Sequence, residues 1–386
     1  MKKKIFISIS VFLAIGLLVF NCKKVEKPLD SKLRLFSRLF DRLINQEQVA
    51  GAQVVIGQNN QILYEEYFGK LNVEVDLPVN SETMFCIGSC SKTFTGVIIM
   101  ALVNDGILKL DIPIDKWLPQ FSTPRITGIG LTERAPTVRE LLCHRSGIYS
   151  QKRSITEKQM NLIRKFSLTL EQSVDEIAKE ELIFQPGTDY AYSGAAYCVL
   201  GRVAEVASGK AFEELLQEKI CQPLDLIRTT YFPSLDDGNI ALGIDSNETG
   251  LVPNRHAPHL LESKHRFPLI GGSIYSTAGE TALFAQMVLN HGRTRSKRVI
   301  SEEAWLEMTS PHADIQVGYY GLGWLLDIRN EEERPWRISH NGRLSGYNSI
   351  VRIYLDNGFF FVAHWTGPAS KAVREAIEET LSQLVS

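Results

Sequence analysis

The sequence predicts an α+β domain in which an antiparallel sheet, built from both ends of the chain and flanked by helices, receives an inserted all-helical lobe. β-rich runs lie near the start at 53–56 and 62–68, and near the end at 347–355 and 359–365. Between them, most apolar residues recur at helical spacing. If these β-rich runs are strands of one antiparallel sheet, they lie side by side, and the two ends of the chain therefore meet in that sheet.

The N-terminal elements are predicted to be a helix, a hairpin and a second helix. Asp30-Ser31 caps the first helix, whose apolar residues recur every three or four positions. Asn59-Asn60 marks the turn of the hairpin. The second helix is expected from Ser89 to about Asn104, with Gly106 just beyond its end.

The helical lobe is expected at roughly 105–270, between the two sets of strands. Its polar segment 150–180 has helical periodicity and is a candidate lid, whereas 230–268 is rich in loop residues. Asn357-Gly358 predicts a tight turn between the last two strands. Further helices are expected at 137–142, 195–207, 277–289 and 371–384.

The first residues predict a targeting segment rather than part of the fold. Three lysines, Lys2–Lys4, precede an apolar run of sixteen residues, 5–20, which is short for a spanning helix of about 20. Cys22 follows this run directly, so we expect a lipoprotein signal with lipidation at Cys22. An uncleaved membrane anchor is the alternative, and either one exports the domain to the cell envelope and holds it at a membrane. The expected organisation is a signal peptide at 1–21, a tether at 22–30 and a hydrolase domain at 31–386.

Charge and cysteine content exclude several classes of protein. Without Lys2–Lys4 the chain has 39 basic residues (42 − 3) against 44 acidic ones, a net charge near −5, and it has no basic tract for nucleic acid. Five cysteines remain after Cys22, an odd number at wide spacing, so buried unpaired thiols are expected. A Cys86–Cys90 disulfide is the alternative. No Cys/His spacing indicates a metal, and no cofactor is expected. The five are Cys86, Cys90, Cys143, Cys198 and Cys221.

Ser89-Cys90-Ser91-Lys92 is the only S-x-x-K tetrapeptide in the chain. It follows the apolar run 84–87 and Gly88, and precedes the apolar stretch 94–103, which predicts strand, tight turn and helix. A serine and a lysine three residues apart share a helix face, so Lys92 can reach and activate the Ser89 hydroxyl. About one such tetrapeptide is expected by chance in a chain of this length, and a capping serine beside a surface lysine is the alternative.

Two later motifs make the tetrapeptide specific. Tyr192-Ser193-Gly194 follows Pro186-Gly187-Thr188, and His340-Asn341-Gly342 precedes Gly346-Tyr347. With three motifs in this order, the sequence resembles the serine β-lactamase and penicillin-binding-protein superfamily. It most resembles the branch that holds class C β-lactamases, DD-peptidases, D-aminopeptidases and related esterases. Stretches such as "PGTDYAYSGAAYCVLGRVAEVASG" and "YGLGW" extend the resemblance over nearly all of 35–385.

The resemblance implies a β-lactamase/transpeptidase-like fold and a set of catalytic roles. Ser89 would be the nucleophile, Lys92 its partner and Tyr192 the general acid/base. The backbone N–H groups of Ser89 and Arg343 would form the oxyanion hole. Lys92 can be the base only when it is neutral; if it stays charged, it would lower the pKa of Tyr192, and tyrosinate would be the base.

The substrate-binding residues implied by the resemblance depart from the usual pattern at two positions. Gly194 replaces an asparagine, which removes an amide that can hold the lysine and a substrate carbonyl. His340 replaces a lysine and is implied to act in catalysis; its imidazole, mostly neutral at pH 7, would bind a substrate carboxylate weakly. Asn341, Gly342 and Arg343 complete the implied binding strand, and Arg343 could supply the missing charge.

The expected function is therefore a membrane-tethered serine hydrolase that forms an acyl-enzyme at Ser89 with esters or with D-amino-acid amides or peptides. The substrate would be a small molecule or a peptidoglycan fragment, and weak β-lactamase or DD-carboxypeptidase activity is a further option. A non-catalytic envelope protein that binds or scaffolds is the alternative, favoured by Gly194. His144 and Ser146 are expected only to end a helix.

Overall fold

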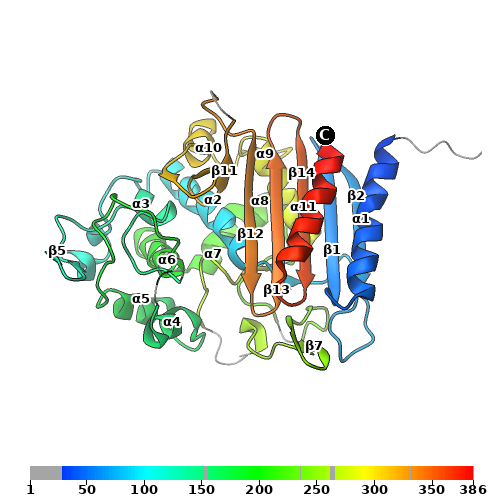
Figure 1. Cartoon of the computed structure of the whole chain (residues 1–386). Helices are drawn as coiled ribbons and strands as arrows, with labels where there is room; N and C mark the ends of the chain where they lie inside the picture. The colour runs from blue at the N-terminus through cyan, green and yellow to red at the C-terminus, as the bar shows by residue number, and fades with distance from the viewer. Residues whose placement is uncertain are drawn as a thin grey trace, which may run out of the picture.

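In the computed structural model, which describes residues 28–385 except 152, 154, 235, 261–265, 330 and 331, one antiparallel sheet joins the two ends of the chain (Figure 1). β1 and β14 pair along their whole length, with Gly51 opposite Thr366 and Gln58 opposite Phe359. The sheet predicted from both ends is confirmed. Its order is β2 (Gln61–Gly69), β1 (Gly51–Gln58), β14 (Phe359–Thr366), β13 (Tyr347–Tyr354), β12 (Arg337–Leu344), β11 (Leu325–Asp327), β10 (Tyr319–Tyr320) and β9 (Ala313–Asp314).

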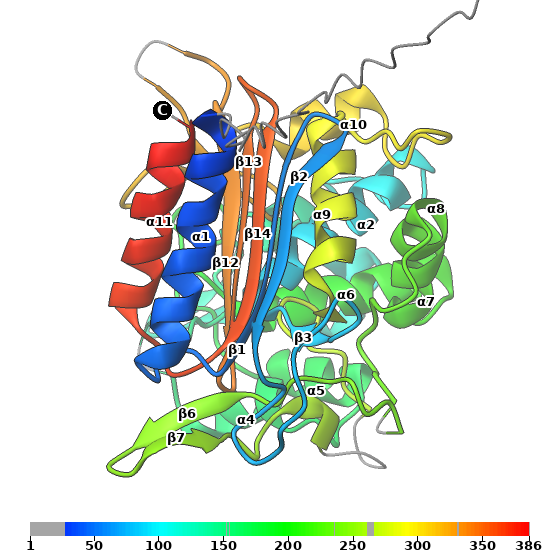
Figure 2. The ribbon, with the colours of Figure 1, turned by 90° about the vertical axis from the view of Figure 1, so that its right-hand side faces the viewer.

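Helices cover both faces of this sheet. The terminal helices α1 (Pro28–Asn45) and α11 (Lys371–Val385) lie side by side on one face (Figure 1 and Figure 2). Three other helices lie on the opposite face: α2 (Ser91–Asn104), α9 (Ala278–Leu289) and α10 (Glu302–Met308).

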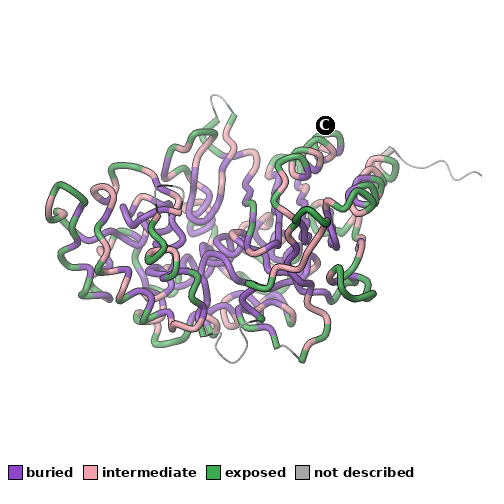
Figure 3. Tube along the Cα trace, turned by 60° about the horizontal axis from the view of Figure 1, so that its bottom comes forward, coloured by how far each residue is buried: buried purple, intermediate pink, exposed green. Residues whose placement is uncertain are grey.

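Side chains of β14 point alternately to the two faces of the sheet, and both faces are apolar, which explains why helices cover both. Phe361, Ala363 and Trp365 pack in the core beneath the terminal helices, whereas Phe360 and Val362 belong to the larger core around α2. Successive side chains of a strand point to opposite faces, so a strand that is apolar throughout is covered on both. Figure 3 shows the buried residues gathered along the sheet and the central helices.

Four further helices form the predicted lobe, at the side of the sheet away from β2 (Figure 1): α3 (Val138–Leu142), α4 (Glu157–Arg164), α5 (Leu170–Ile177) and α6 (Gly194–Ser208). The short helices α7 (Phe212–Leu216) and α8 (Gln222–Leu224) follow in the chain and lie behind the sheet, on the face that α2 covers. Three short hairpins or ladders complete the structure: β3 (Phe85–Cys86) with β8 (Tyr275–Ser276), β4 (Arg125–Ile126) with β5 (Gly130–Leu131), and β6 (Ile244–Asn247) with β7 (Gly250–Pro253).

The β6–β7 hairpin lies in a stretch expected to be loop. In β6 only Ile244 is buried, so no apolar alternation marked it. The signal segment and Cys22 lie outside the described residues. Among those described, no helix combines the length and apolar character needed to cross a bilayer.

Arg352 joins α11 to the strand that carries the third motif. This buried guanidinium donates from Nε to Glu378 Oε1 at 2.9 Å, and its Nη2 also contacts that carboxylate. Nη1 donates to the carbonyl of His340 at 3.2 Å and Nη2 to Asn341 Oδ1 at 2.7 Å. The terminal helix therefore helps to fix β12.

We expect Glu378→Ala to lower the free energy of unfolding by about 1–3 kcal/mol, because it leaves the buried Arg352 charge without a carboxylate. The lower part of that range reflects solvent screening, since the Glu378 side chain is 34% exposed. Urea unfolding measures the loss. The control is Glu375→Ala, whose Lys371 partner is 84% exposed, with an expected change within about 0.5 kcal/mol. Equal losses in the two variants would contradict a structural role for the Arg352–Glu378 pair.

Candidate active site

Ser89 stands on a short helical turn, Gly88–Cys90, directly before α2. Gly88 has φ of +52°, and a Cβ there would lie 2.4 Å from the backbone nitrogen of Arg343. Only glycine allows both this conformation and this approach. Ser89 is half-exposed and lines a cavity of about 130 Å³. The predicted order of strand, turn and helix is confirmed, and Ser89 borders a cavity that can hold a ligand.

Lys92 reaches the Ser89 hydroxyl from within the protein. Its Nζ lies 3.4 Å from Ser89 Oγ and donates to the carbonyl of Gly271 at 2.7 Å. The Nζ is also 4.7 Å from the ring centroid of Tyr192 and 5.0 Å from that of Tyr197, within the range where ring faces attract a cation. Lys92 is buried, so its amine has few orientations other than the one toward Ser89.

Tyr192 completes the group from the loop before α6. Burial raises the pKa of its phenol, and a hydrogen bond with Ser89 opposes only part of that rise. This is the reverse of the lowered pKa expected if the charge of Lys92 dominated. A phenol with a raised pKa is protonated at neutral pH, so Tyr192 in the resting molecule is a proton donor.

His144 supports the Tyr192 loop, which the sequence did not indicate. Its Nδ1 accepts from the backbone N–H of Ser193 at 3.1 Å, and its ring centroid lies 4.3 Å from that of Tyr192. His144 also follows the C-cap residue of α3, Cys143, and its φ of +62° is in keeping with the expected helix stop. It is therefore a positioning residue that acts through Tyr192.

The third motif, His340-Asn341-Gly342, lies on β12 beside the Gly88–Cys90 turn. A Cβ at Gly342 would lie 2.0 Å from the carbonyl oxygen of Ile87, so glycine is needed for this contact. Pairing with β11 ends at Ser339, and the outer edge beyond it has no strand partner among the described residues. Arg343 lines the Ser89 cavity from this edge. The two backbone N–H groups predicted as the oxyanion hole thus come from segments in close contact.

His340 and Asn341 do not line the cavity themselves. His340 is buried, with Nε2 3.1 Å from the Tyr320 hydroxyl, Nδ1 2.8 Å from the Asn341 carbonyl, and its ring centroid 6.3 Å from that of Tyr192. The amide oxygen of Asn341 accepts from Arg352, on the α11 side of the sheet. The catalytic role of His340 stays a prediction, and the structure places it beside Tyr192.

Gln151 supplies the amide that Gly194 lacks. Its Oε1 accepts from the backbone N–H of Gly194 at 2.9 Å, and a Cβ built on Gly194 would lie 2.2 Å from its Nε2. The Gln151 side chain therefore occupies the space that an asparagine at 194 would take, and it lines the same cavity. No periodicity or spacing in the sequence connects the two positions.

Two guanidinium groups make the cavity lining positively charged. Arg164 and Arg343 line it together with the Lys92 amine, and no aspartate or glutamate does. Within the described part of the chain, neither arginine forms an ion pair with a carboxylate. Desolvation lowers the pKa of Arg164, at the end of α4, although part of its side chain is exposed. Guanidinium groups that line a cavity and have no carboxylate partner favour a negatively charged ligand.

The cysteines beside Ser89 cannot compete as nucleophiles. Cys86, Cys90 and the other three described cysteines are unpaired and buried, as predicted, so the alternative Cys86–Cys90 disulfide is absent. Burial raises the pKa of Cys86 to about 12 and that of Cys90 to about 11. Thiols of this kind are unreactive because the thiolate is the nucleophile.

Comparisons with known proteins agree with this geometry. The model of a family described as Beta-lactamase matches residues 36–384. Esterase EstB of Burkholderia gladioli is 28% identical over 373 residues, which cover 88% of this chain and 93% of the esterase. The teichoic acid D-alanine hydrolase of Staphylococcus aureus is 27% identical over 233 residues, 60% of this chain and about half (52%) of that hydrolase. The solved structure of EstCE1, a hydrolase with promiscuous acyltransferase activity, superposes with a TM-score of 0.79 at 21% identity, covering 91% of this chain and 98% of EstCE1, and shares the fold.

We expect Gly194→Asn alone to slow labelling of Ser89 by a fluorophosphonate, because the new side chain collides with Gln151. Gln151→Ala alone should slow it about tenfold by removing the amide. The double variant Gly194→Asn/Gln151→Ala should recover most of the rate, since the amide returns from the other position. Labelling rates from intact mass test this, and additive losses in the double variant would show that the two positions do not share a role.

Proposed function

Because the chain belongs to the beta-lactamase family and is a serine hydrolase of that family, we propose that it cleaves esters or D-amino-acid amides and peptides through an acyl-enzyme at Ser89. The observation that carries this proposal is the half-exposed Ser89 hydroxyl with Lys92 Nζ at 3.4 Å and the Tyr192 phenol in hydrogen-bonding contact. A hydroxyl so placed has both an open approach for a carbonyl and a path for its proton.

Acylation follows from these contacts. Ser89 Oγ forms a bond to the substrate carbonyl carbon while its proton passes to Lys92, directly or by way of Tyr192. The carbonyl oxygen becomes an oxyanion that the N–H groups of Ser89 and Arg343 stabilise, each worth roughly 2.7–4 kcal/mol. Collapse breaks the bond to the leaving alcohol or amine, which takes a proton from Tyr192, and the proton held on Lys92 passes to Tyr192 to restore its phenol. The raised pKa of Tyr192 suits this donor step.

Deacylation reverses the proton path. A water attacks the acyl carbon, gives a proton to the Lys92–Tyr192 pair, and the acid product leaves as Ser89 recovers its proton. Because Tyr192 rests protonated, Lys92 is the better candidate for the base that starts each half-reaction.

The volume of the Ser89 cavity suits substrates with small acyl groups. About 130 Å³ is roughly four times the volume of a water molecule in the liquid, which suits an acetyl or alanyl group. One similar protein is named an esterase and another a teichoic acid D-alanine hydrolase. A D-alanyl ester on an anionic polymer would combine the small acyl group with the charge that Arg164 and Arg343 favour.

We also propose that the domain is exported and held at a membrane through Cys22. The support is the sequence alone: three lysines, an apolar run and a cysteine placed directly after it. The non-catalytic alternative drew on the missing amide at Gly194, and Gln151 supplies an amide there. That alternative therefore loses its main argument.

Ser89→Ala should abolish labelling by a fluorophosphonate or a penicillin and lower hydrolysis of p-nitrophenyl acetate by at least about 1,000-fold. Lys92→Ala and Tyr192→Phe should each lower kcat by about 100- to 10,000-fold, since each removes a proton-transfer group. Ser246→Ala, on the exposed β6–β7 hairpin, is the control and should be unaffected. An adduct that persists in Ser89→Ala, or inertness of the unmodified protein towards esters, D-amino-acid amides and β-lactams alike, would defeat the proposal.

Arg164→Gln and Arg343→Gln should each raise KM for 4-acetoxybenzoate about tenfold, with little change for its neutral methyl ester, because only the carboxylate pairs with a guanidinium. Both esters deliver the same acetyl group. Arg295→Gln, an exposed arginine outside the cavity, is the matched control. Equal KM changes for the charged and neutral esters would exclude an anion-binding role for these arginines.

A further inference from the structure

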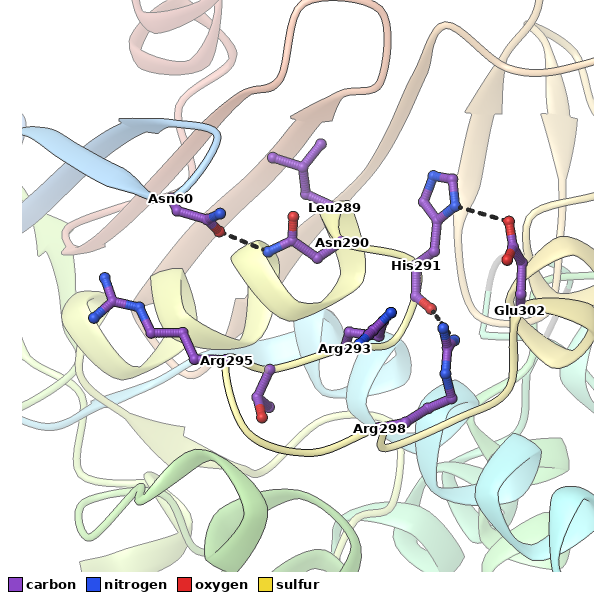
Figure 4. A pocket seen from close by; sticks show the side chains of 9 residues that line it. Asn60, Leu289, Asn290, His291, Arg293, Arg295, Arg298 and Glu302 are labelled. Carbon is purple, nitrogen blue, oxygen red and sulfur yellow. Dashed lines mark hydrogen bonds and ion pairs between the residues drawn. The ribbon is translucent and has the colours of Figure 1, made fainter.

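A broad hollow lies away from Ser89, around the loop that follows α9 (Figure 4). It measures about 540 Å³ and is open to solvent. We call residues 291–298 the basic loop, because Arg293, Arg295, Lys297 and Arg298 all lie in it. Three of these four cations line the hollow, and Glu302 is the one carboxylate among its lining residues.

Three of the four cations in the basic loop have no carboxylate partner among the described residues. Arg293, Arg295 and Lys297 are exposed, and none forms an ion pair with any described carboxylate. Arg298 donates to the carbonyls of His291 at 3.1 Å and of Ile300 at 3.3 Å, which fixes the loop. A backbone hydrogen bond and, more weakly, the Arg298 charge lower the pKa of the Glu303 carboxyl. Glu302 faces His291, with Oε1 3.4 Å from Nδ1. The loop therefore presents a local positive field although the whole chain carries a net charge of −2.

The basic loop lies at the end of the molecule where the described chain begins. α1 ends close to the start of β1, so its first residues lie level with the turn that ends β1 (Figure 2). Asn290 Nδ2 donates to Asn60 Oδ1 at 2.8 Å and Gln286 Nε2 to the Asn59 carbonyl at 3.2 Å, which fixes the loop against that same turn. The first described residues of the chain and the basic loop therefore lie at the same end of the molecule.

The Ser89 cavity lies toward the opposite end. On β12, Leu344 pairs with Tyr347, which pairs with Thr366, which in turn pairs with Gly51 at the start of β1. Arg343 thus stands at the end of the sheet remote from the β1–β2 turn. A surface that contacts the basic loop would leave the Ser89 cavity free.

We propose that the basic loop rests on the phosphates of anionic phospholipids in the membrane that holds the chain. The proposal rests on the proposed tether. Several exposed cations around an open hollow suit an extended sheet of phosphates better than one enclosed ligand. Each basic side chain near an anionic bilayer strengthens binding about fivefold, and the attraction falls off over about 10 Å. The contact would point the active site away from the bilayer, toward polymers of the envelope.

The test uses the full chain reconstituted in vesicles that contain a rhodamine-headgroup lipid as energy acceptor. A dansyl-bearing amino acid replaces Ser296 in the basic loop or, as control, Ser246 on the exposed β6–β7 hairpin. With phosphatidylglycerol vesicles, transfer from position 296 should exceed transfer from 246 severalfold. The excess should vanish with phosphatidylcholine alone, in 0.5 M salt, and in Arg293→Gln/Arg295→Gln/Lys297→Gln. That triple variant should keep its ester hydrolysis, because the loop is outside the Ser89 cavity.

The proposal is overturned if transfer from the two positions stays equal with phosphatidylglycerol, or if the triple variant keeps the excess. It is also overturned if inorganic phosphate removes the excess while chloride of equal ionic strength does not, since that result indicates a site for one free anion. If the protein dissociates from phosphatidylcholine vesicles but stays bound to phosphatidylglycerol vesicles, the proposed tether is wrong and the proposed contact of the basic loop is supported. Ester hydrolysis by the same samples reports separately on the proposed enzyme activity.

Discussion

The close approach of the Gly88–Cys90 turn, which carries Ser89, to β12 is the constraint on which the site depends. Gly88 and Gly342 face the opposing backbone at distances that leave no space for a side chain. Ser349, on β13, then donates its hydroxyl to the carbonyl of Ile87 at 2.6 Å and fixes the turn from the sheet side. Two layers that meet this tightly place the Ser89 and Arg343 amides together without any side chain between them. Precision at the reacting carbon therefore comes from backbone packing.

In the proposed mechanism, the proton path is made by Tyr192 of the lobe and by Lys92 of α2. Tyr192 enters from the loop before α6, held by the His144 contact to Ser193. The carbonyl of Gly271 accepts a hydrogen bond from the Lys92 amine. Burying an amine costs free energy unless its N–H groups find partners, and here the Gly271 carbonyl and the aromatic rings leave the amine directed at Ser89. The proposed catalytic residues thus meet at the junction of the lobe and the sheet.

Local patterns were sufficient for part of this structure. The terminal strands follow from β-rich runs with turn residues between them, the helices follow from helical spacing, and the Ser89–Lys92 contact follows from positions three apart. Tyr192 and Arg343 could be placed only through ordered motifs, because their contacts join distant segments. Gln151 could not be predicted at all: its amide matters only because Gly194 leaves a gap beside it. β9 and β10 were also missed, since two residues are too few to show a period.

The pairing of β1 with β14 carries a consequence for how the chain matures. Strands from opposite ends of the polypeptide lie next to each other inside the sheet, so its hydrogen-bond ladder cannot close until nearly the whole chain is available. Contacts between such remote segments make folding slow relative to that of local topologies. Until then the apolar strands at the start of the chain stay exposed, which makes a partly synthesised molecule prone to aggregation.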